Sequence, residues 1–476
     1  MKKSLPFVLL SFCLVFIFIL TPTAFADDVD INETNFPDSV FRNYVSVNCD
    51  RDGNGKLSET EISRSRSISL NKSGLSSLKG IEFFTSLTNL SCGNNQLTRL
   101  DVSNNTALTS LYCYGNQLTR LDVSNNTALT ALYCTRNQLT RLDVSNNTAL
   151  ISLYCPNNQL TRLDVRNNTA LTSLDCSSNQ LTNLDVGNNT VLTSLDCFGN
   201  QLTSLDVSNN TALTALNCSS NPLTSLNVSN NTALTSLNCY NNQLTSLDVS
   251  NNTVLNSLDC MENQLTSLDV SNNTALTSLV CDYNQLTVLN INNNSALTSL
   301  SCVENQLTSL DVSFCTFLRR LYCFSNNIET LDISNCPKLF ALVHNTQPEI
   351  SGSIVRYKEP GTIITSSTTI IEFDKGVTLI TPTPDIFLPA SLKILSEDAF
   401  SGGAFRYVKL SEQTEYVGPF AFANCPNLRY IYIPNETTTI DSNAFGDIQE
   451  LVIFGKAGST ADDFAYDHDF TFIPIS

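Results

Sequence analysis

The feature that most constrains this chain is a 21-residue unit that recurs through its middle. The first copy, residues 87–107, reads L-T-N-L-S-C-G-N-N-Q-L-T-R-L-D-V-S-N-N-T-A. Eleven more copies follow in register and begin at Leu108, Leu129, Leu150, Leu171, Leu192, Leu213, Leu234, Leu255, Leu276, Leu297 and Leu318. One such coil cannot bury its own apolar face, whereas stacked coils share a continuous core. The repeat therefore predicts a solenoid, which we place at residues 64–344 with looser units at both ends.

Each unit carries a short strand signal. Leu and Cys alternate with polar residues at a period of two, which predicts a strand that turns both side chains inward. The frame L-x-x-L-x-C-x-x-N-x-L resembles the leucine-rich repeat, and the short unit resembles its internalin-like bacterial form. The resemblance implies a mostly β solenoid, a curved array of short parallel strands. The Asn at position 9 of each unit, from Asn95 to Asn326, predicts a ladder whose amides satisfy backbone groups at the turn.

Cysteine occupies the same inward strand position in all twelve units. Neighbouring thiols would lie about 4.8 Å apart with parallel Cβ vectors, a direction that suits a disulfide poorly. A straight ladder also lacks the convergent ligands that a metal needs. Buried free thiols are the favoured interpretation, with some disulfides or metal chemistry as the alternatives. These residues are Cys92, Cys113, Cys134, Cys155, Cys176, Cys197, Cys218, Cys239, Cys260, Cys281, Cys302 and Cys323.

The N-terminus predicts export. Lys2 and Lys3 precede an apolar run, and Ala24-Phe25-Ala26 supplies a cleavage site, so residues 1–26 read as a signal peptide. An uncleaved membrane anchor is the alternative. No later apolar run reaches the length of a membrane span. The formal net charge of −18 includes only 26 Lys and Arg, which argues against nucleic-acid binding. We expect a secreted or surface-associated extracellular protein.

Residues 27–63 predict a small helical cap that contains a calcium-loop motif. The sequence D-R-D-G-N-G-K-L-S-E-T-E, residues 50–61, matches the twelve-residue EF-hand loop. Gly55 stands at the sharp turn. A metal-free turn of the same sequence is the alternative, and dockerins carry similar loops in pairs. The predicted Ca²⁺ ligands are Asp50, Asp52, Asn54, the carbonyl of Lys56, Ser58 through a water, and Glu61.

A second repeat follows the array. Residues 345–387 predict a β-rich connecting segment. Ala399-Phe400, Ala421-Phe422 and Ala444-Phe445 then recur with short strands between them. Residues 388–476 resemble the BspA-type leucine-rich repeats of bacterial surface proteins, and the last residues resemble the closing cap of that family.

The sequence predicts a binding protein and not an enzyme. It has two histidines and no nucleophile–base motif or phosphate-binding loop. The variable positions lie on the outward strand face, where solenoids bind. Aromatic residues there are candidate anchors, although cross-strand stacking would also explain them. An acidic stretch follows and favours a cationic partner. The candidate partner-binding residues are Tyr112, Tyr114, Tyr133, Tyr154, Asp175 and Asp196.

A column of Asp at position 15 has a structural interpretation. Stacked like charges repel unless they are hydrogen-bonded or screened, so these carboxylates predict a backbone-capping ladder. Arg at position 13 offsets the first four, after which Asn183 and Ser204 take the Arg position. We therefore expect a scaffold that recognises a protein or glycan through its strand face. The alternative is a purely structural extracellular component or an enzyme accessory without a ligand of its own.

Overall fold

The computed structural model describes residues 28–336 and 391–475 apart from residues 404 and 449, with Leu339 and short strands between residues 350 and 388. The signal-peptide prediction for residues 1–26 lies outside the described residues. So does most of the predicted connecting segment, of which only strands are described: β19 (Ile350–Ser351), β20 (Ile354–Arg356), β21 (Gly361–Ser366), β22 (Thr369–Phe373), β23 (Thr378–Ile380) and β24 (Ile386–Phe387).

The N-terminal cap closes the first coil. Helix α1 (Ser39–Asn48) begins after Asp38, whose side chain accepts hydrogen bonds from the first turn. The second oxygen of Asp38 accepts bonds from Ser76 and Ser77, which ties the cap to the array. Phe36 and Phe41 are fully buried in the continuous core. The other cap elements are β1 (Val29–Asp30), β2 (Lys56–Leu57), α2 (Glu59–Arg64) and the 3₁₀ turn η1 (Ile81–Phe83).

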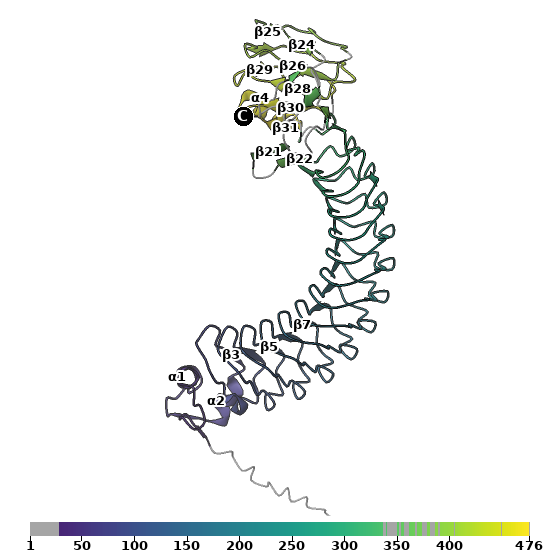
Figure 1. Cartoon of the computed structure of the whole chain (residues 1–476). Helices are drawn as coiled ribbons and strands as arrows, with labels where there is room; N and C mark the ends of the chain where they lie inside the picture. Colours follow the sequence, from purple (N-terminus) through teal and green to yellow (C-terminus); the bar gives the residue numbers. More distant parts are fainter. Residues whose placement is uncertain are drawn as a thin grey trace, which may run out of the picture.

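A curved parallel sheet forms the body of the molecule and confirms the predicted solenoid. Its strands lie on the inner edge of the arc (Figure 1), and successive units pair in register, as Leu111 does with Leu132. Strands β22 and β21 continue the sheet after β17. The array strands are β3 (Ser67–Ser69), β4 (Asn89–Ser91), β5 (Ser110–Tyr112), β6 (Ala131–Tyr133), β7 (Ser152–Tyr154), β8 (Ser173–Asp175), β9 (Ser194–Asp196), β10 (Ala215–Asn217), β11 (Ser236–Asn238), β12 (Ser257–Asp259), β14 (Ser278–Val280), β16 (Ser299–Ser301) and β17 (Arg320–Tyr322).

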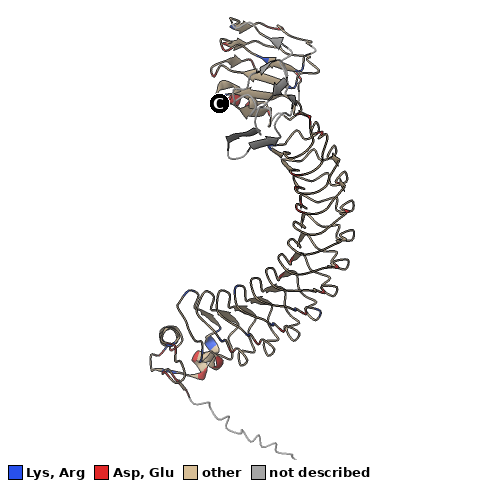
Figure 2. Ribbon diagram, viewed as in Figure 1, with Lys and Arg blue, Asp and Glu red and all other residues tan. Residues whose placement is uncertain are grey.

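Shorter pairings lie outside this sheet. Strand β13 (Leu268–Asp269) pairs with β15 (Leu289–Asn290), and β18 (Thr330–Asp332) pairs with β23. Most of the array ribbon is uncharged, whereas α2 shows both acidic and basic residues (Figure 2). The coils are therefore held together mainly by apolar burial and hydrogen bonds.

The cysteines form a buried column behind the strands. All twelve strand-position cysteines are at most 2% exposed, and the first eleven, Cys92 to Cys302, are free thiols, as the sequence analysis predicted. Burial raises the pKa of the Cys113 thiol to about 12, so the thiolate that reacts or binds metal is not populated at neutral pH. Cys315 and Cys336 are also buried, and each donates its S–H to a carbonyl of the preceding coil.

The Asn at position 9 forms the predicted ladder. The Asn179 Nδ2 group donates to the carbonyls of Cys155 and Cys176, and its Oδ1 accepts from the Leu160 N–H at 3.0 Å. The same pattern repeats one coil later at Asn200. Each rung therefore links two coils through buried polar groups that would otherwise be unsatisfied.

The C-terminal segment is a second, separately cored solenoid. Phe400, Phe422 and Phe445 stack along it with centroids 5.5 and 5.6 Å apart, which explains the recurring Ala-Phe pairs. Arg406 donates a hydrogen bond to Asn335 at the end of the first array. The elements of the C-terminal solenoid are β25 (Ile394–Leu395), β26 (Tyr407–Lys409), β27 (Tyr416–Val417), β28 (Tyr430–Ile433), β29 (Thr439–Ile440), β30 (Val452–Gly455), α4 (Thr460–Asp467) and β31 (Thr471–Pro474).

Candidate binding face and candidate calcium site

The predicted calcium loop, residues 50–61, turns sharply at Gly55. Gly55 has a φ of +79°, which favours glycine. Its N–H donates to Asp50 at 2.9 Å, and the Asp52 and Asn54 side chains each accept a bond from the N–H two residues later. These Asx turns bend the loop around its own side chains.

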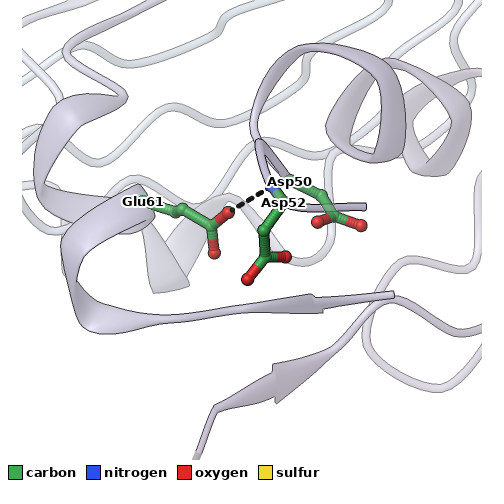
Figure 3. Close-up of side chains that lie close together, drawn as sticks. All are labelled: Asp50, Asp52 and Glu61. Atoms are coloured by element: carbon green, nitrogen blue, oxygen red, sulfur yellow. Dashed lines mark hydrogen bonds between the residues drawn. The ribbon is translucent and has the colours of Figure 1, made fainter. Parts of the chain in front are cut away.

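The structure brings three carboxylates of this loop together. One oxygen each from Asp50, Asp52 and Glu61 lie within 4.8 Å of one another (Figure 3). Ca²⁺ binds oxygen at about 2.3–2.6 Å, so a single ion can contact all three. The donor set therefore fits Ca²⁺. The Ser58 hydroxyl donates to Glu61 and caps α2, while Lys56 pairs with Asp30 at 3.3 Å.

Glu61 also closes the loop through hydrogen bonds. Its carboxylate accepts from the N–H and hydroxyl of Ser58 at 2.9 and 2.8 Å and from the Arg51 N–H at 2.7 Å. Burial by itself raises the pKa of Glu61, but these bonds and a weaker one from Asp52 outweigh it and lower the pKa from 4.5 to about 2. Glu61 is therefore charged at neutral pH.

The predicted tyrosine row exists and is stacked. Tyr112 and Tyr133 have ring centroids 4.8 Å apart, and Tyr133 and Tyr154 lie 4.6 Å apart and nearly parallel. All three are half-buried. Because the rings cover one another, a ligand meets their edges and hydroxyls. Tyr114 lies over Gly93 of the preceding coil, where an added Cβ would fall 2.5 Å from its ring.

The row becomes acidic where the tyrosines end. Asp175 pairs with Asp196 across neighbouring strands. The Asp175 carboxylate accepts bonds from the N–H and hydroxyl of Ser177, and Asp196 accepts from the N–H of Phe198 and the side chain of Asn217. Burial, together with the neighbouring Asp175 charge, raises the pKa of Asp196.

Sequence reasoning missed the two asparagines that continue this polar row towards Asp259. Asn217, Asn238 and Asp259 continue it in register, and each side chain accepts a bond from the N–H two residues later. The signal was the same outward position in each unit. Sequence reasoning also missed a cavity of about 450 Å³ between the two solenoids, whose lining includes Phe317 and Arg429.

Comparisons with known proteins place the chain in a family. The functional domain of InlJ from Listeria monocytogenes, described as including a cysteine ladder, is 36% identical over 66% of this chain and 75% of that chain, with a TM-score of 0.58. The chain belongs to the internalin-like family of bacterial leucine-rich repeat proteins. A second internalin-like relative, InlF from Listeria monocytogenes, is 27% identical over 65% of this chain and 96% of that chain, with a TM-score of 0.59.

The C-terminal part of this internalin-like protein matches a second family model. Residues 379–457 match the BspA-type leucine-rich repeat region in six copies. No curated protein sequence matches the chain significantly. Within the described residues, no helix has the length and apolar character needed to cross a bilayer.

Proposed function

We propose that this internalin-like protein is a secreted or surface-associated scaffold that binds a protein or a glycan through its concave strand face. The supporting observation is the row at position 5, which changes from stacked Tyr to Asp and Asn. The Leu and Cys residues behind it stay the same and stay buried. The fold therefore leaves this row free to vary, and extended concave faces are where solenoids bind.

The proposal includes no catalytic chemistry. His468 is the only histidine in the described residues, and its ring stacks on Phe464 at a centroid distance of 4.0 Å. Its Nδ1 lies 2.9 Å from the Phe464 carbonyl. The buried cysteines have raised pKa values. Within the part of the chain that the structure describes, neither residue type presents an activated nucleophile beside a base.

The test compares variants of the strand face on one partner. A partner is first captured from surface extracts with the parent protein. Its affinity is then measured by surface plasmon resonance for the parent, for a triple Tyr112→Ser, Tyr133→Ser, Tyr154→Ser variant, and for Asp175→Asn with Asp196→Asn. We expect at least one strand-face variant to bind about 30-fold more weakly, as loss of an interface anchor does.

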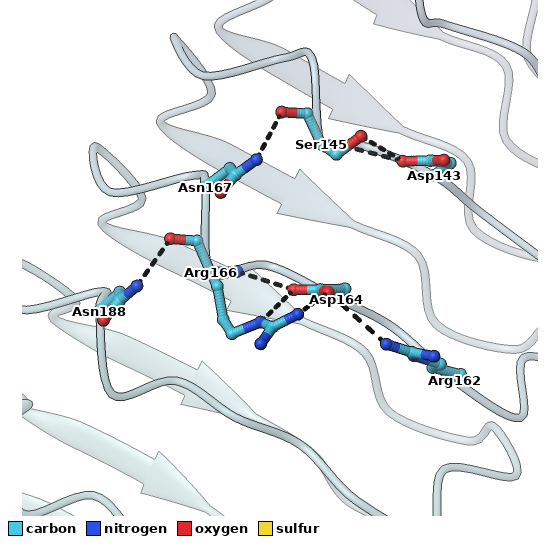
Figure 4. A network of polar contacts seen from close by, with 7 residues as sticks. All are labelled: Asp143, Ser145, Arg162, Asp164, Arg166, Asn167 and Asn188. Carbon is cyan, nitrogen blue, oxygen red and sulfur yellow. Dashed lines mark hydrogen bonds and ion pairs between the residues drawn. The ribbon is translucent and has the colours of Figure 1, made fainter.

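The matched control lies on the outer turns. Asn167 and Asn188 are exposed and bond only to a backbone carbonyl of the preceding coil (Figure 4). Their replacement by Ala should leave affinity unchanged. Equal affinities for all folded variants would favour the alternative of a purely structural component without a ligand of its own. The observation that supports this alternative is that the Tyr rings stack face to face and cover one another.

We also propose that the loop of residues 50–61 binds Ca²⁺ and orders the N-terminal cap. The ion would be held by Asp50, Asp52 and Glu61 together with oxygens of Asn54 and Lys56, and its charge would offset the repulsion of the carboxylates. Ser58 would contribute through water.

Titration calorimetry with CaCl₂ tests this loop. The parent should release or absorb heat with one-site stoichiometry, and Asp52→Asn should bind at least about tenfold more weakly because it removes one ligand charge. Asn at this position keeps the oxygen that accepts the Asn54 N–H, so the turn is preserved. Absence of binding heat in the parent at both 15 and 35 °C would contradict the proposal.

A further inference from the structure

A row of arginines runs along the first four coils, outside the strand face. Each residue stands at position 13, two residues before an Asp of the capping ladder. Asp101 and Asp122 pair as parallel neighbours, so successive arginines lie about one strand spacing apart, ~4.8 Å. All are exposed, and the Arg162 side chain is 81% exposed. The row consists of Arg99, Arg120, Arg141 and Arg162.

The arginines are not needed for the turns beside them. The Asp101 side chain accepts a bond from the Ser103 N–H at 3.0 Å in a coil that has Arg. Asp206 accepts the equivalent bond from Ser208 at 2.9 Å in a coil that has Ser204 at the Arg position. Later coils thus serve as an internal comparison: the turn forms equally well without Arg.

Most of the row has no ion-pair partner. Of the four arginines in the row, only Arg162 has a described carboxylate within 4.0 Å, that of Asp164 at 3.7 Å. Asp164 is already held by both Nε and Nη2 of Arg166 at 3.0 and 2.6 Å (Figure 4). The Asp101 and Asp143 carboxylates are turned into their own Ser turns, which lower their pKa values most, while the Arg99 and Arg141 charges add a smaller lowering without direct contact. The guanidinium charges therefore remain available to a partner.

The row is also the main basic feature of the array. Six Arg and four Asp occur in residues 87–170, whereas no Lys or Arg occurs between Arg166 and Arg319. An anion that approaches the array therefore meets a run of cations on the first four coils and then no further cation until Arg319.

We propose that the arginine row is a second binding surface, which takes a linear anionic polysaccharide with carboxylates or sulfates on successive sugars. The guanidinium fork matches both groups bidentately and stays charged at all relevant pH values. Exposed Thr98 and Gln96 lie on the same coil edge and offer polar groups to sugar hydroxyls. No aromatic side chain occupies the row to stack nucleic-acid bases, and no apolar one occupies it to enter a membrane.

The test uses defined probes on the mature protein. Affinity is measured by fluorescence anisotropy for a sulfated heparin-derived dodecasaccharide, an unsulfated oligogalacturonate of equal length and single-stranded DNA. Replacing all four row arginines with Ser, the residue that most later coils carry, should weaken binding to at least one oligosaccharide about 30-fold at low salt. The two sugar probes distinguish sulfate from carboxylate recognition.

Matched variants distinguish binding by the arginine row from a general effect of added positive charge. Asn183→Arg with Ser204→Arg extends the row by two coils and should tighten binding. Asn188→Arg with Asn209→Arg adds the same charge on exposed turns of the same coils and should not. Failure of the parent to bind either oligosaccharide, equal affinity after loss of the row, equal gain from both added pairs, or tighter binding to DNA would each overturn the proposal.

Discussion

Replacing Asn179 with Asp should lower the free energy of unfolding by about 4 kcal/mol at pH 7. The side chains have the same shape, but the Nδ2 group of Asn179 donates to the carbonyls of Cys155 and Cys176, 3.1 and 3.0 Å away. An Asp would place a buried, unpaired carboxylate oxygen against both carbonyls, and such a charge typically costs about 3–5 kcal/mol.

Urea denaturation followed by circular dichroism measures this effect. Asn167→Asp makes the same chemical change at an exposed position of the same array and should cost less than about 0.5 kcal/mol. The buried carboxyl of the Asn179→Asp variant would have a raised pKa in the folded state. Its destabilisation should therefore shrink as the pH falls towards 4. Equal stability of the two variants would show that the ladder contributes little.

Acid should weaken the N-terminal cap through Glu61. Its pKa falls from 4.5 to about 2 on folding, so the folded state binds its proton less readily than the unfolded state. The resulting stabilisation is fully present above pH 4.5 and is lost as the pH falls from 4.5 towards 2. A difference of this size corresponds to about 3 kcal/mol.

The Glu61→Gln variant tests whether the acid sensitivity of the cap comes from Glu61. In calcium-free buffer at pH 7 it should lose about 3 kcal/mol of cap stability, because the amide cannot accept all the bonds that converge on the carboxylate. Its cap should then lose less stability than the parent cap between pH 4.5 and 2. Part of the acid response remains, because burial raises the pKa of Asp38 but hydrogen bonds from Ser76 and Phe41 lower it overall. Hydrogen exchange of residues 36–64, read by mass spectrometry, isolates the cap from the array. Exposed Glu59→Gln on the same helix is the control, and an unchanged acid response in Glu61→Gln would contradict the assignment.

The repeat made the architecture predictable, since twelve units in register leave few other ways to bury Leu and Cys. The backbone at position 8 was less accessible to sequence reasoning. It adopts a left-handed conformation at Asn94, where Asn tolerates it, but also at Arg136 and Tyr283, with φ of 52° and 51°. Backbone pairing between coils imposes this geometry. The N–H of the residue at position 8 donates to a carbonyl of the next coil whatever side chain that residue carries, as the Tyr283 N–H does to the Val303 carbonyl.

The candidate sites were predictable to different degrees. The loop of residues 50–61 follows from fixed spacing, which is why Asp50, Asp52 and Glu61 meet as expected. That Glu61 also accepts bonds from Arg51 depends on how α2 packs, which spacing does not encode. Likewise, the register put Tyr112 and Tyr133 side by side, but whether their faces are open depends on side-chain rotamers.

The near-identity of the units has a consequence for how the length of this protein changes over generations. Recombination between repeated gene segments would add or delete whole 21-residue units. Each new junction restores the same Cys column, Asn ladder and strand register, because every coil contacts only its neighbours. Such a change moves the cap and the C-terminal solenoid apart or together by ~4.8 Å per unit and rotates one relative to the other along the arc. The length of the array can thus change in fixed steps while every coil keeps its fold.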